Sequence, residues 1–322
     1  MAPIGSDILY VQRLLEAGSI VAIPTETVYG LAGNAYDETS VLKIFRTKRR
    51  PSFDPLIVHA SGLQQIQGFV KPLPSKALKL ARRFWPGPLT LVLEKKSTIP
   101  DIVTAGLPSV GVRVPQHVLT LQLLRRLDFP LAAPSANPFG YISPTTPQHV
   151  QDQLGIHIPY ILDGGACAVG VESTIVGFDA EQPILYRLGG VSLEAIERTV
   201  GPVKVVHQAN NHPQAPGMLT SHYAPKNPLI LGKLPELLAA YATQQVGVLA
   251  FQQYRLGVVH NRQVVLSRTG NLEEAAQKLF AALRTLDTLP VEIILAELVP
   301  SIGIGRAIND RLKKAATCRV RC

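Results

Sequence analysis

The sequence predicts an α/β protein made of two domains. Short apolar runs alternate along most of the chain with segments whose apolar residues recur at helical spacing. The chain has 322 residues, which is enough for two domains of ordinary size. The composition changes at residues 205–228, where Gln, Asn, Pro and Gly gather as they do in linkers. We therefore expect an N-terminal domain over 1–204, a linker over 205–228 and a smaller C-terminal domain over 229–322.

Local signals place the elements of the N-terminal part. Asp7 can cap a first helix that Gly18 ends, and Ser192 can open the last one. Apolar runs between these points predict buried strands, and apolar residues at helical spacing predict helices. We expect helices at 8–17, 75–85, 118–127 and 192–200, and strands at 20–23, 56–58, 89–93, 109–115, 131–133, 161–163, 174–178 and 184–188.

The C-terminal part repeats the alternation on a smaller scale. Strands are predicted at 229–231, 246–251, 264–266 and 293–295, with helices from Leu234, over 272–286 and over 305–314. Strands that alternate with helices favour a small parallel sheet. Gly303 and Gly305 are not followed by the third glycine of a dinucleotide fingerprint, so that motif is rejected.

Composition and charge narrow the class of protein. The chain is 46% hydrophobic and 17% charged, so it is not disordered. Its net charge of +9 favours an anionic partner such as a nucleotide, a phosphate or RNA. The three cysteines form no C-x-x-C pair, which is typical of a reducing cytoplasm. The N-terminus lacks a signal-peptide pattern and no apolar run approaches the length of a membrane span, so we expect no membrane association.

A cationic segment lies at residues 45–59. Lys48 and Arg50 belong to a basic cluster at the end of a short helical pattern that Pro51 should stop, and His59 follows the next strand. This arrangement can hold positive charge against an anionic ligand. The alternative is that the basic residues only complement the helix dipole at a solvated end.

Polar side chains also follow several predicted strands. P-T-E-T-V-Y-G at 24–30 and L-A-A-P-S-A-N-P-F-G-Y-I-S at 131–143 carry hydroxyl and amide groups at strand ends, where ligands of open α/β sheets bind. Both could instead be capped turns. Arg113 interrupts an apolar strand and therefore needs a partner or a ligand. The linker carries S-H-Y-A-P at 221–225, which a simple spacer would not need.

Taken together, these strings resemble the YrdC-like threonylcarbamoyl-AMP synthases, in the long form with an extra C-terminal domain. The resemblance implies a twisted mixed-sheet N-terminal domain and a smaller Rossmann-like α/β C-terminal domain. It covers nearly the whole chain in the family's order. The matching strings are P-T-E-T-V-Y-G, K-R-R-P, P-L-I-V-H, W-P-G-P-L-T, R-V-P, A-A-P-S-A-N, V-E-S-T-I-V, L-G-G, H-Y-A-P and G-I-G-R-A-I-N-D-R-L-K-K-A.

The resemblance implies a nucleotidyltransferase reaction. L-threonine and bicarbonate would give an N-carboxylated threonine, and ATP would transfer AMP to it with release of pyrophosphate. Mg²⁺ would accompany the ATP phosphates. The product would supply the N6-threonylcarbamoyladenosine modification of tRNA (t6A37) through a separate tRNA threonylcarbamoyl transferase machinery, and weak binding of tRNA by this chain is a further expectation.

The resemblance also implies the site residues. Lys48, Arg50, Ser135 and Asn137 would act on the transferred group, and Tyr223 would close over the nucleotide as a lid. The remaining implied ATP residues are Asp54, Ser109, Ser143 and Arg187, and the implied L-threonine residues are Thr27, His59, Arg113, Ala133 and Ser173. Asp54 departs from the asparagine usual in the family. Its carboxylate could hold Mg²⁺, orient a basic neighbour or point away.

Two other functions are compatible with the sequence. The charge of +9 would suit a non-enzymatic module that binds double-stranded RNA or tRNA, although few aromatic residues stand among the basic residues near Lys48. A related carbamoyl-nucleotide enzyme that uses another amino acid is the other alternative.

Overall fold

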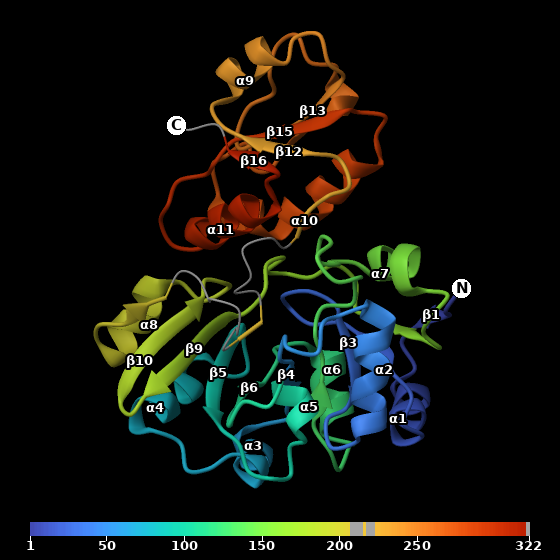
Figure 1. Cartoon of the computed structure of the whole chain (residues 1–322), viewed down its shortest axis with the longest axis vertical. Coiled ribbons are helices and arrows are strands. Elements are labelled where there is room, and N and C mark those ends of the chain that lie inside the picture. Colours follow the sequence, from blue (N-terminus) through green and yellow to red (C-terminus); the bar gives the residue numbers. More distant parts are fainter. Residues whose placement is uncertain (207–214, 217–222, 320–322) are drawn as a thin grey trace. The chain divides into compact units, whose positions relative to one another are not determined.

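The computed structural model of the chain describes residues 1–206, 215–216 and 223–319 (Figure 1). The chain divides into two compact units, each with its own sheet. Unit 1 comprises Met1–Phe139, Pro144–Ala168 and Glu172–Leu219, and unit 2 comprises Gly140–Ser143, Val169–Val171 and Thr220–Cys322. The domain limits expected at residues 205 and 228 stay predictions, because much of that stretch lies outside the described residues.

Unit 1 is built on an eleven-stranded mixed sheet. Its strand order is β1-β8-β2-β3-β7-β4-β6-β5-β9-β10-β11. Parallel pairs such as β4–β6 and β5–β9 alternate with antiparallel pairs such as β5–β6 and β9–β10. The strands are β1 (Ile4–Gly5), β2 (Val21–Ile23), β3 (Gly30–Asn34), β4 (Ile57–His59), β5 (Leu89–Glu94), β6 (Ser109–Arg113), β7 (Leu131–Ala132), β8 (Ile161–Leu162), β9 (Thr174–Asp179), β10 (Gln182–Arg187) and β11 (Lys204–Val205).

Eight helices accompany this sheet in the described part of unit 1. The expected caps are present: Asp7 accepts a hydrogen bond from the Tyr10 N–H at 2.9 Å, and Ser192 caps the last helix through the Ala195 N–H. The helices are α1 (Ile8–Glu16), α2 (Glu38–Lys48), α3 (Leu63–Phe69), α4 (Ser75–Phe84), α5 (Asp101–Thr104), α6 (Val118–Leu124), α7 (Pro147–Leu154) and α8 (Leu193–Val200).

The core of unit 1 explains why its strands are so apolar. A large cluster of buried side chains includes Val58, Leu91 and Val112 from three neighbouring strands, together with helix residues such as Ile44. A second cluster packs α1 and α6 against β2 and contains Leu15 and Leu123. Burial of this much apolar surface is the main stabilising contribution to the unit.

Unit 2 contains a five-stranded sheet in which every observed pair is parallel. The strand order is β14-β13-β15-β12-β16, so the small parallel sheet predicted for the C-terminal part is confirmed. Within this unit, α9 lies on one side of the sheet and α10 and α11 lie on the other (Figure 1). The elements are β12 (Leu229–Leu231), α9 (Leu234–Ala240), β13 (Val246–Ala250), the 3-10 turn η1 (His260–Arg262), β14 (Gln263–Val265), α10 (Leu272–Thr288), β15 (Ile293–Ala296), α11 (Gly305–Ala315) and β16 (Cys318–Arg319).

Some expected helix ends differ from the structure by two residues or more. The helix expected over 118–127 ends at Leu124, and the helix expected over 272–286 ends at Thr288. The helix that carries the cationic segment ends at Lys48, two residues earlier than a stop at Pro51 would require. Arg49 is its C-cap and adopts the left-handed conformation with φ 52°. A residue in this conformation turns the chain out of the helix, so Arg49 rather than the proline ends it.

No helix in the described ranges is both long and apolar enough to cross a lipid bilayer.

Candidate active site

The end of α2 brings a lysine into the interior of unit 1. Lys48 is only 1% exposed, and its ammonium donates hydrogen bonds of 2.5 Å to the carbonyl oxygens of Ser135 and Asn137. The Lys48 carbonyl in turn accepts from the Phe139 N–H at 2.8 Å. The cationic segment is therefore joined to the A-P-S-A-N loop that follows β7.

Arg50 is held beside Lys48 by the loop that follows. Its guanidinium donates to the carbonyls of Asp54 at 3.0 Å and Pro55 at 2.8 Å. Its Nη2 also lies 2.9 Å from the Asp54 carboxylate, which is fully buried. Of the three possibilities for Asp54, this contact favours the one in which the carboxylate orients a basic neighbour.

Burial and neighbouring charges shift the pKa values of Lys48 and Asp54 in this cluster. Burial lowers the pKa of the Lys48 ammonium well below its ordinary value, and the Arg50 charge acts in the same direction. Burial raises the pKa of the Asp54 carboxyl, while the charges of Arg50, Lys48 and Arg187 oppose that rise. Three basic side chains thus act on one buried carboxylate, and such a cluster is suited to an anionic ligand.

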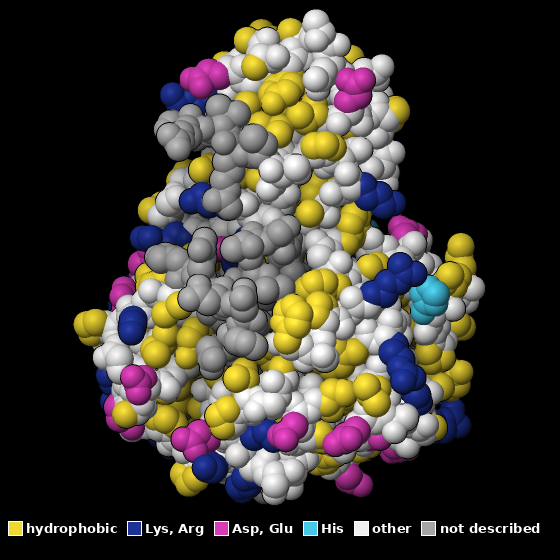
Figure 2. Space-filling model, viewed as in Figure 1, with side chains coloured by type: hydrophobic (Ala, Val, Ile, Leu, Met, Phe, Trp, Pro, Cys, Tyr) yellow, Lys and Arg dark blue, Asp and Glu magenta, His cyan; other side chains and the backbone are white. Residues whose placement is uncertain are grey.

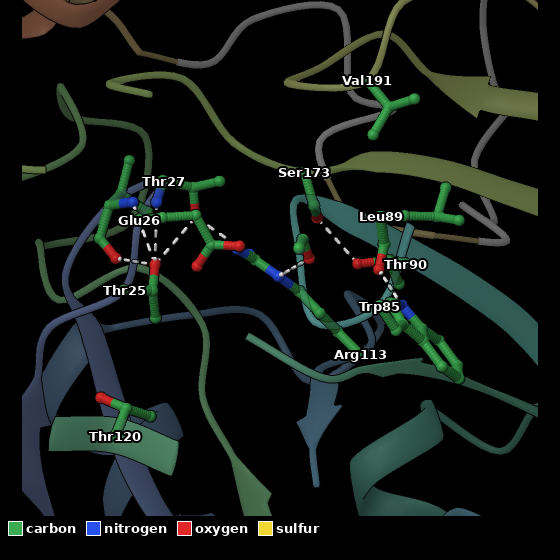
Figure 3. A network of polar contacts seen from close by, with 12 residues as sticks. Thr25, Glu26, Thr27, Trp85, Leu89, Thr90, Arg113, Thr120, Ser173 and Val191 are labelled. Carbon is green, nitrogen blue, oxygen red and sulfur yellow. Dashed lines mark hydrogen bonds and ion pairs between the residues drawn. The ribbon is translucent and has the colours of Figure 1, made fainter. Parts of the chain in front are cut away.

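A second buried ion pair lies at the carboxyl end of β6. Arg113 Nη2 is 2.7 Å from a carboxylate oxygen of Glu26, and Nη1 donates to the Thr27 hydroxyl at 2.9 Å (Figure 3). Nε donates to the carbonyl of Gly87 at 3.1 Å. The contact with Glu26 has the distance of an ion pair without the alignment of a hydrogen bond, so Nη2 and both Glu26 oxygens keep hydrogen-bonding capacity.

The P-T-E-T turn is fixed by its own hydroxyl groups. The Thr25 hydroxyl donates to the Val28 carbonyl at 2.6 Å and lies 2.8 Å from the Thr27 hydroxyl. The Thr120 hydroxyl donates to the Pro24 carbonyl. The local capping that was the alternative reading is therefore present, and it holds Thr27 in place against Arg113 (Figure 3).

Ser173 connects three strands of the sheet. Its hydroxyl lies 2.7 Å from that of Thr90 on β5 and accepts from Arg187 Nη2 at 3.1 Å (Figure 3 draws the contact with Thr90). Arg187 Nε also donates to the Ser173 carbonyl at 3.0 Å. Since the Arg187 charge also acts on Asp54, this arginine links the strand start at Ser173 to the cationic cluster.

His59 is buried next to Arg113. The two residues are paired in the register of β4 and β6, and the His59 ring is 4% exposed. Burial, reinforced by the Arg113 charge, lowers the pKa of His59 to about 3. The imidazole is therefore neutral near pH 7, and its Nδ1 has no hydrogen-bond partner among the described residues.

The parallel pair β4–β6 separates the predicted residues into two groups. Ile57 pairs with Gly111 and His59 with Arg113, so His59 and Arg113 mark the carboxyl end of the pair. Ser109 begins β6 at the amino end, the same end as the loop that holds Arg50. Four residues of strand set the two ends about 13 Å apart. Arg50 and Ser109 thus lie at one end of this strand pair and His59 and Arg113 at the other. The two predicted sets are nevertheless in contact elsewhere, because Arg187, predicted for ATP, donates to Ser173, predicted for threonine.

Ala133 packs against the start of β4. Its N–H donates to the Ile57 carbonyl at 3.0 Å, and it is buried. Gly30 approaches Ala133 so closely that a Cβ on Gly30 would meet the Ala133 Cβ at 3.3 Å. Small residues on both segments thus allow the two backbones to approach closely here.

Two predicted ATP residues fall in unit 2. The carbonyl of Ser143 accepts from Arg284 Nε at 3.3 Å. The Tyr223 ring is 1% exposed, stacks on Phe280 at 5.6 Å and faces the Arg311 guanidinium at 5.1 Å. Tyr223 thus packs against elements of unit 2, and its function as a lid stays a prediction. His222 of the H-Y-A-P motif lies outside the described residues.

The sequence interpretation missed Glu26. Its carboxylate is 6% exposed and is the partner that Arg113 was expected to need. A signal was available, because Glu26 is the one acid in a run of residues placed at a strand end. Thr90 was missed as well, and its place in the apolar run of β5 gave no signal.

Comparison with known proteins assigns the family. Residues 13–189 match the family Sua5/YciO/YrdC, described as "Telomere recombination", and residues 191–317 match "Threonylcarbamoyl-AMP synthase, C-terminal domain". The threonylcarbamoyl-AMP synthase of Pyrococcus abyssi is 40% identical over 95% of this chain and 93% of its own length. That of Bacillus subtilis is 42% identical over 95% of this chain and 92% of its own length.

A solved structure agrees over the whole length. The crystal structure of P. abyssi Sua5 complexed with L-threonine superimposes with a TM-score of 0.93 at 37% identity and covers 99% of this chain and all of that chain. The expected fold, a mixed-sheet domain with a smaller α/β domain, is confirmed. The chain belongs to the threonylcarbamoyl-AMP synthase family.

Proposed function

We propose that the chain is an L-threonylcarbamoyladenylate synthase that makes threonylcarbamoyl-AMP and pyrophosphate from L-threonine, bicarbonate and ATP. The observation that supports it most is the presence of two buried arginines near β4 and β6, Arg50 beside Lys48 and Arg113 beside His59, each fixed by a carboxylate. One suits a triphosphate and the other suits an amino-acid carboxylate. The relatives that match the whole chain carry the name of this enzyme.

The group around Lys48 and Arg50 would act on ATP. A carbamate oxygen of the N-carboxylated threonine attacks the α-phosphorus of ATP. The bond between the α-phosphorus and the oxygen that bridges it to the β-phosphate breaks, and pyrophosphate leaves with the negative charge. Fixed cations next to the leaving group stabilise that charge. A bound triphosphate would also favour the charged form of Lys48, whose pKa burial holds low.

The group around Arg113 would hold threonine. A guanidinium donates charge-assisted hydrogen bonds to a carboxylate, and Nη2 of Arg113 keeps donor capacity because its contact with Glu26 is an ion pair and not a hydrogen bond. Glu26 and Thr27 fix the position of the guanidinium from two sides. The neutral His59 ring lies beside it and can accept a hydrogen bond from the substrate without adding a charge.

Mg²⁺ would arrive with ATP. The described residues contain no group of three His, Cys, Asp or Glu side chains that could hold a metal ion, and the Asp54 carboxylate faces Arg50. Such a set fits a magnesium ion that is bound mainly by substrate phosphates and water. In that position the ion would neutralise charge on the triphosphate.

The proposal has consequences for partners. The product is a mixed anhydride that water would hydrolyse, so an enzyme that transfers the threonylcarbamoyl group to tRNA must consume it. A tRNA threonylcarbamoyl transferase machinery is therefore the expected downstream partner, and any binding of tRNA by this chain would be weak.

The alternative of a non-enzymatic RNA-binding module is not favoured. The relatives that cover the chain bear the name of an enzyme. On the face that Figure 2 shows, Lys and Arg side chains are scattered among Asp and Glu. Non-specific RNA binding instead favours a continuous basic groove or stripe.

The test is pyrophosphate release from ATP and Mg²⁺ by the purified chain, with threonine and bicarbonate omitted in turn. Release that requires both substrates would support the adenylylation proposed here. Release without threonine would indicate a different acceptor. No release, together with salt-dependent RNA binding that ignores threonine, would contradict the proposal and favour the binding module.

A further inference from the structure

Unit 2 contains a pocket that shares no residue with the site proposed above. It has a volume of about 530 Å³, which lies within the usual range for small-molecule sites. All of its walls come from unit 2. The lining residues used below are Leu231, Lys233, Pro235, Arg255, Leu298 and Lys313, together with the carboxylates Glu236 and Glu297.

The parallel sheet accounts for the position of the pocket. Leu231 ends β12 and Glu297 follows β15, so the pocket lies at the carboxyl ends of these neighbouring strands. Strands β13 and β15 are neighbours, but the connections that leave them run in opposite directions across the sheet. The chain passes from β13 to β14 at one edge and from β15 to β16 at the other edge. Such a reversal of direction marks the place where open α/β sheets bind ligands.

An arginine and a glutamate line the pocket at the carboxyl ends of β13 and β15. Arg255 follows β13, and its Nη2 contacts both oxygens of Glu297, at 3.0 and 2.8 Å. The same carboxylate accepts the N–H of Phe251 at 2.9 Å. Glu297 therefore fixes the guanidinium, and the buried Nε of Arg255 has no acceptor among the described residues. A fixed guanidinium with an unused donor is suited to an anion.

The other walls add both charge and apolar surface. Together with Arg255, Lys233 and Lys313 give the pocket three basic side chains, and Glu236 and Glu297 give it two carboxylates. Glu236 lies 3.4 Å from Lys233. Leu298, with 39% of its surface exposed, supplies an apolar wall together with the exposed Pro235. An inorganic anion would leave this apolar wall without a contact, and a purely apolar molecule would remove water from the cations without replacing it.

We propose that this pocket binds a mononucleotide, a nucleoside monophosphate, with its phosphate on Arg255, Lys233 and Lys313 and its base against Pro235 and Leu298. The volume suits a ligand of this size, and basic and apolar side chains line the same pocket. The chain would then carry two nucleotide sites, one for the ATP that reacts in unit 1 and one in unit 2.

Photoaffinity labelling of the full chain with 8-azido-AMP, followed by peptide mapping, tests the proposal. We expect adducts on peptides that contain residues 231–236 or 297–298, and unlabelled AMP should prevent them. The double variant Lys233→Gln/Lys313→Gln should lower this labelling about tenfold, while labelling of unit 1 peptides should not change. The control Lys278→Gln alters an exposed lysine of α10 that does not line the pocket and should label normally.

A second variant tests the apolar wall. Leu298→Glu places a charge where the base is expected and should also reduce labelling of the unit 2 peptides, with the circular dichroism of the chain unchanged. Adducts confined to unit 1 peptides would overturn the proposal. So would unit 2 labelling that both pocket variants leave intact, or that inorganic phosphate prevents as effectively as AMP, because the pocket would then recognise an anion without a base.

Discussion

At the scale of single residues, the site depends on charges that the fold buries rather than exposes. Lys48, Arg50 and Arg113 are each less than a tenth exposed, and each donates to carbonyl or hydroxyl groups that hold its position. A charge removed from water interacts more strongly with an opposite charge than one at the surface does. These side chains are therefore positioned before a substrate binds, which lowers the reorganisation needed during the reaction.

Replacement of Lys48 should abolish turnover without unfolding the protein. Lys48→Met keeps most of the length of the side chain and removes the ammonium, so we expect pyrophosphate release to fall by about a hundredfold or more. Steady-state rates with saturating threonine and bicarbonate measure the effect. Arg46→Ala is the matched control, because Arg46 is exposed on the same helix, and it should keep normal activity. Equal rates for the two variants would show that Lys48 has no function in the reaction.

Replacement of Glu26 should affect threonine more than ATP. Glu26→Gln removes the charge that holds Arg113, so the KM for threonine should rise about tenfold, equivalent to about 1.4 kcal/mol. The KM for ATP should stay within twofold or so, because the cationic group near Lys48 is unaffected. Initial rates with each substrate varied in turn separate the two effects. A parallel rise in both constants would contradict a function specific to Arg113.

His59 should make the stability of the protein depend on pH. Its pKa falls from an ordinary value of 6.5 to about 3 on folding, so the unfolded chain binds a proton that the folded chain rejects between these values. The resulting stability is present above pH 6.5 and is lost as the pH falls, by at most about 1.4 kcal/mol per pH unit.

Urea unfolding at pH 6.5 and 5.5 measures that loss. Between these two values the free energy of unfolding should fall by about 1 kcal/mol more in the wild type than in His59→Gln, which lacks the titrating ring. Identical falls in the two proteins would show that the His59 ring is not buried in its neutral form.

At the scale of elements, the strand ends that carry the site are held by close backbone packing. A Cβ on Gly189, just after β10, would lie 2.3 to 2.4 Å from backbone atoms of Glu172, Ser173 and Thr174 at the start of β9. Real Cβ atoms do not approach this closely, and the neighbours are backbone rather than flexible side chains. The L-G-G string therefore acts by letting two chain segments meet, and it keeps Ser173 within reach of Arg187.

Two glycine substitutions should have opposite effects. Gly189→Ala should destabilise unit 1 by more than 2 kcal/mol or so and lower activity, because β9 must shift. Gly68→Ala lies within α3, has open space around its Cβ and should stabilise the protein by about 0.5–1 kcal/mol. Thermal unfolding of the two variants measures both changes. A Gly189→Ala protein as stable as the wild type would show that the segments can separate without cost.

At the scale of the whole molecule, ligand binding should appear as added stability. A ligand that binds only the folded state at one hundred times its Kd stabilises that state by about 2.7 kcal/mol. L-threonine should therefore raise the Tm, and Arg113→Lys should reduce the rise because an ammonium cannot form the paired hydrogen bonds of a guanidinium. Arg126→Lys, at an exposed position, serves as the control and should respond like the wild type. An equal shift with D-threonine would contradict a specific amino-acid site.

By itself, the sequence determined the α/β class, most helices and strands, and the parallel sheet of unit 2. These features follow from local signals, such as the Asp7 and Ser192 caps and the apolar run at 229–231, which act over a few residues. The same signals, joined by resemblance, selected the family.

Only the tertiary structure decided which distant residues meet. The contacts of Arg113 with Glu26, of Lys48 with the carbonyls of Ser135 and Asn137, and of Arg284 with the carbonyl of Ser143 join residues that are 86 or more positions apart. Strand order and register bring such residues together, and neither is encoded by a local pattern, because each strand could satisfy its backbone hydrogen bonds with several neighbours. Burial of the whole core selects one arrangement among them.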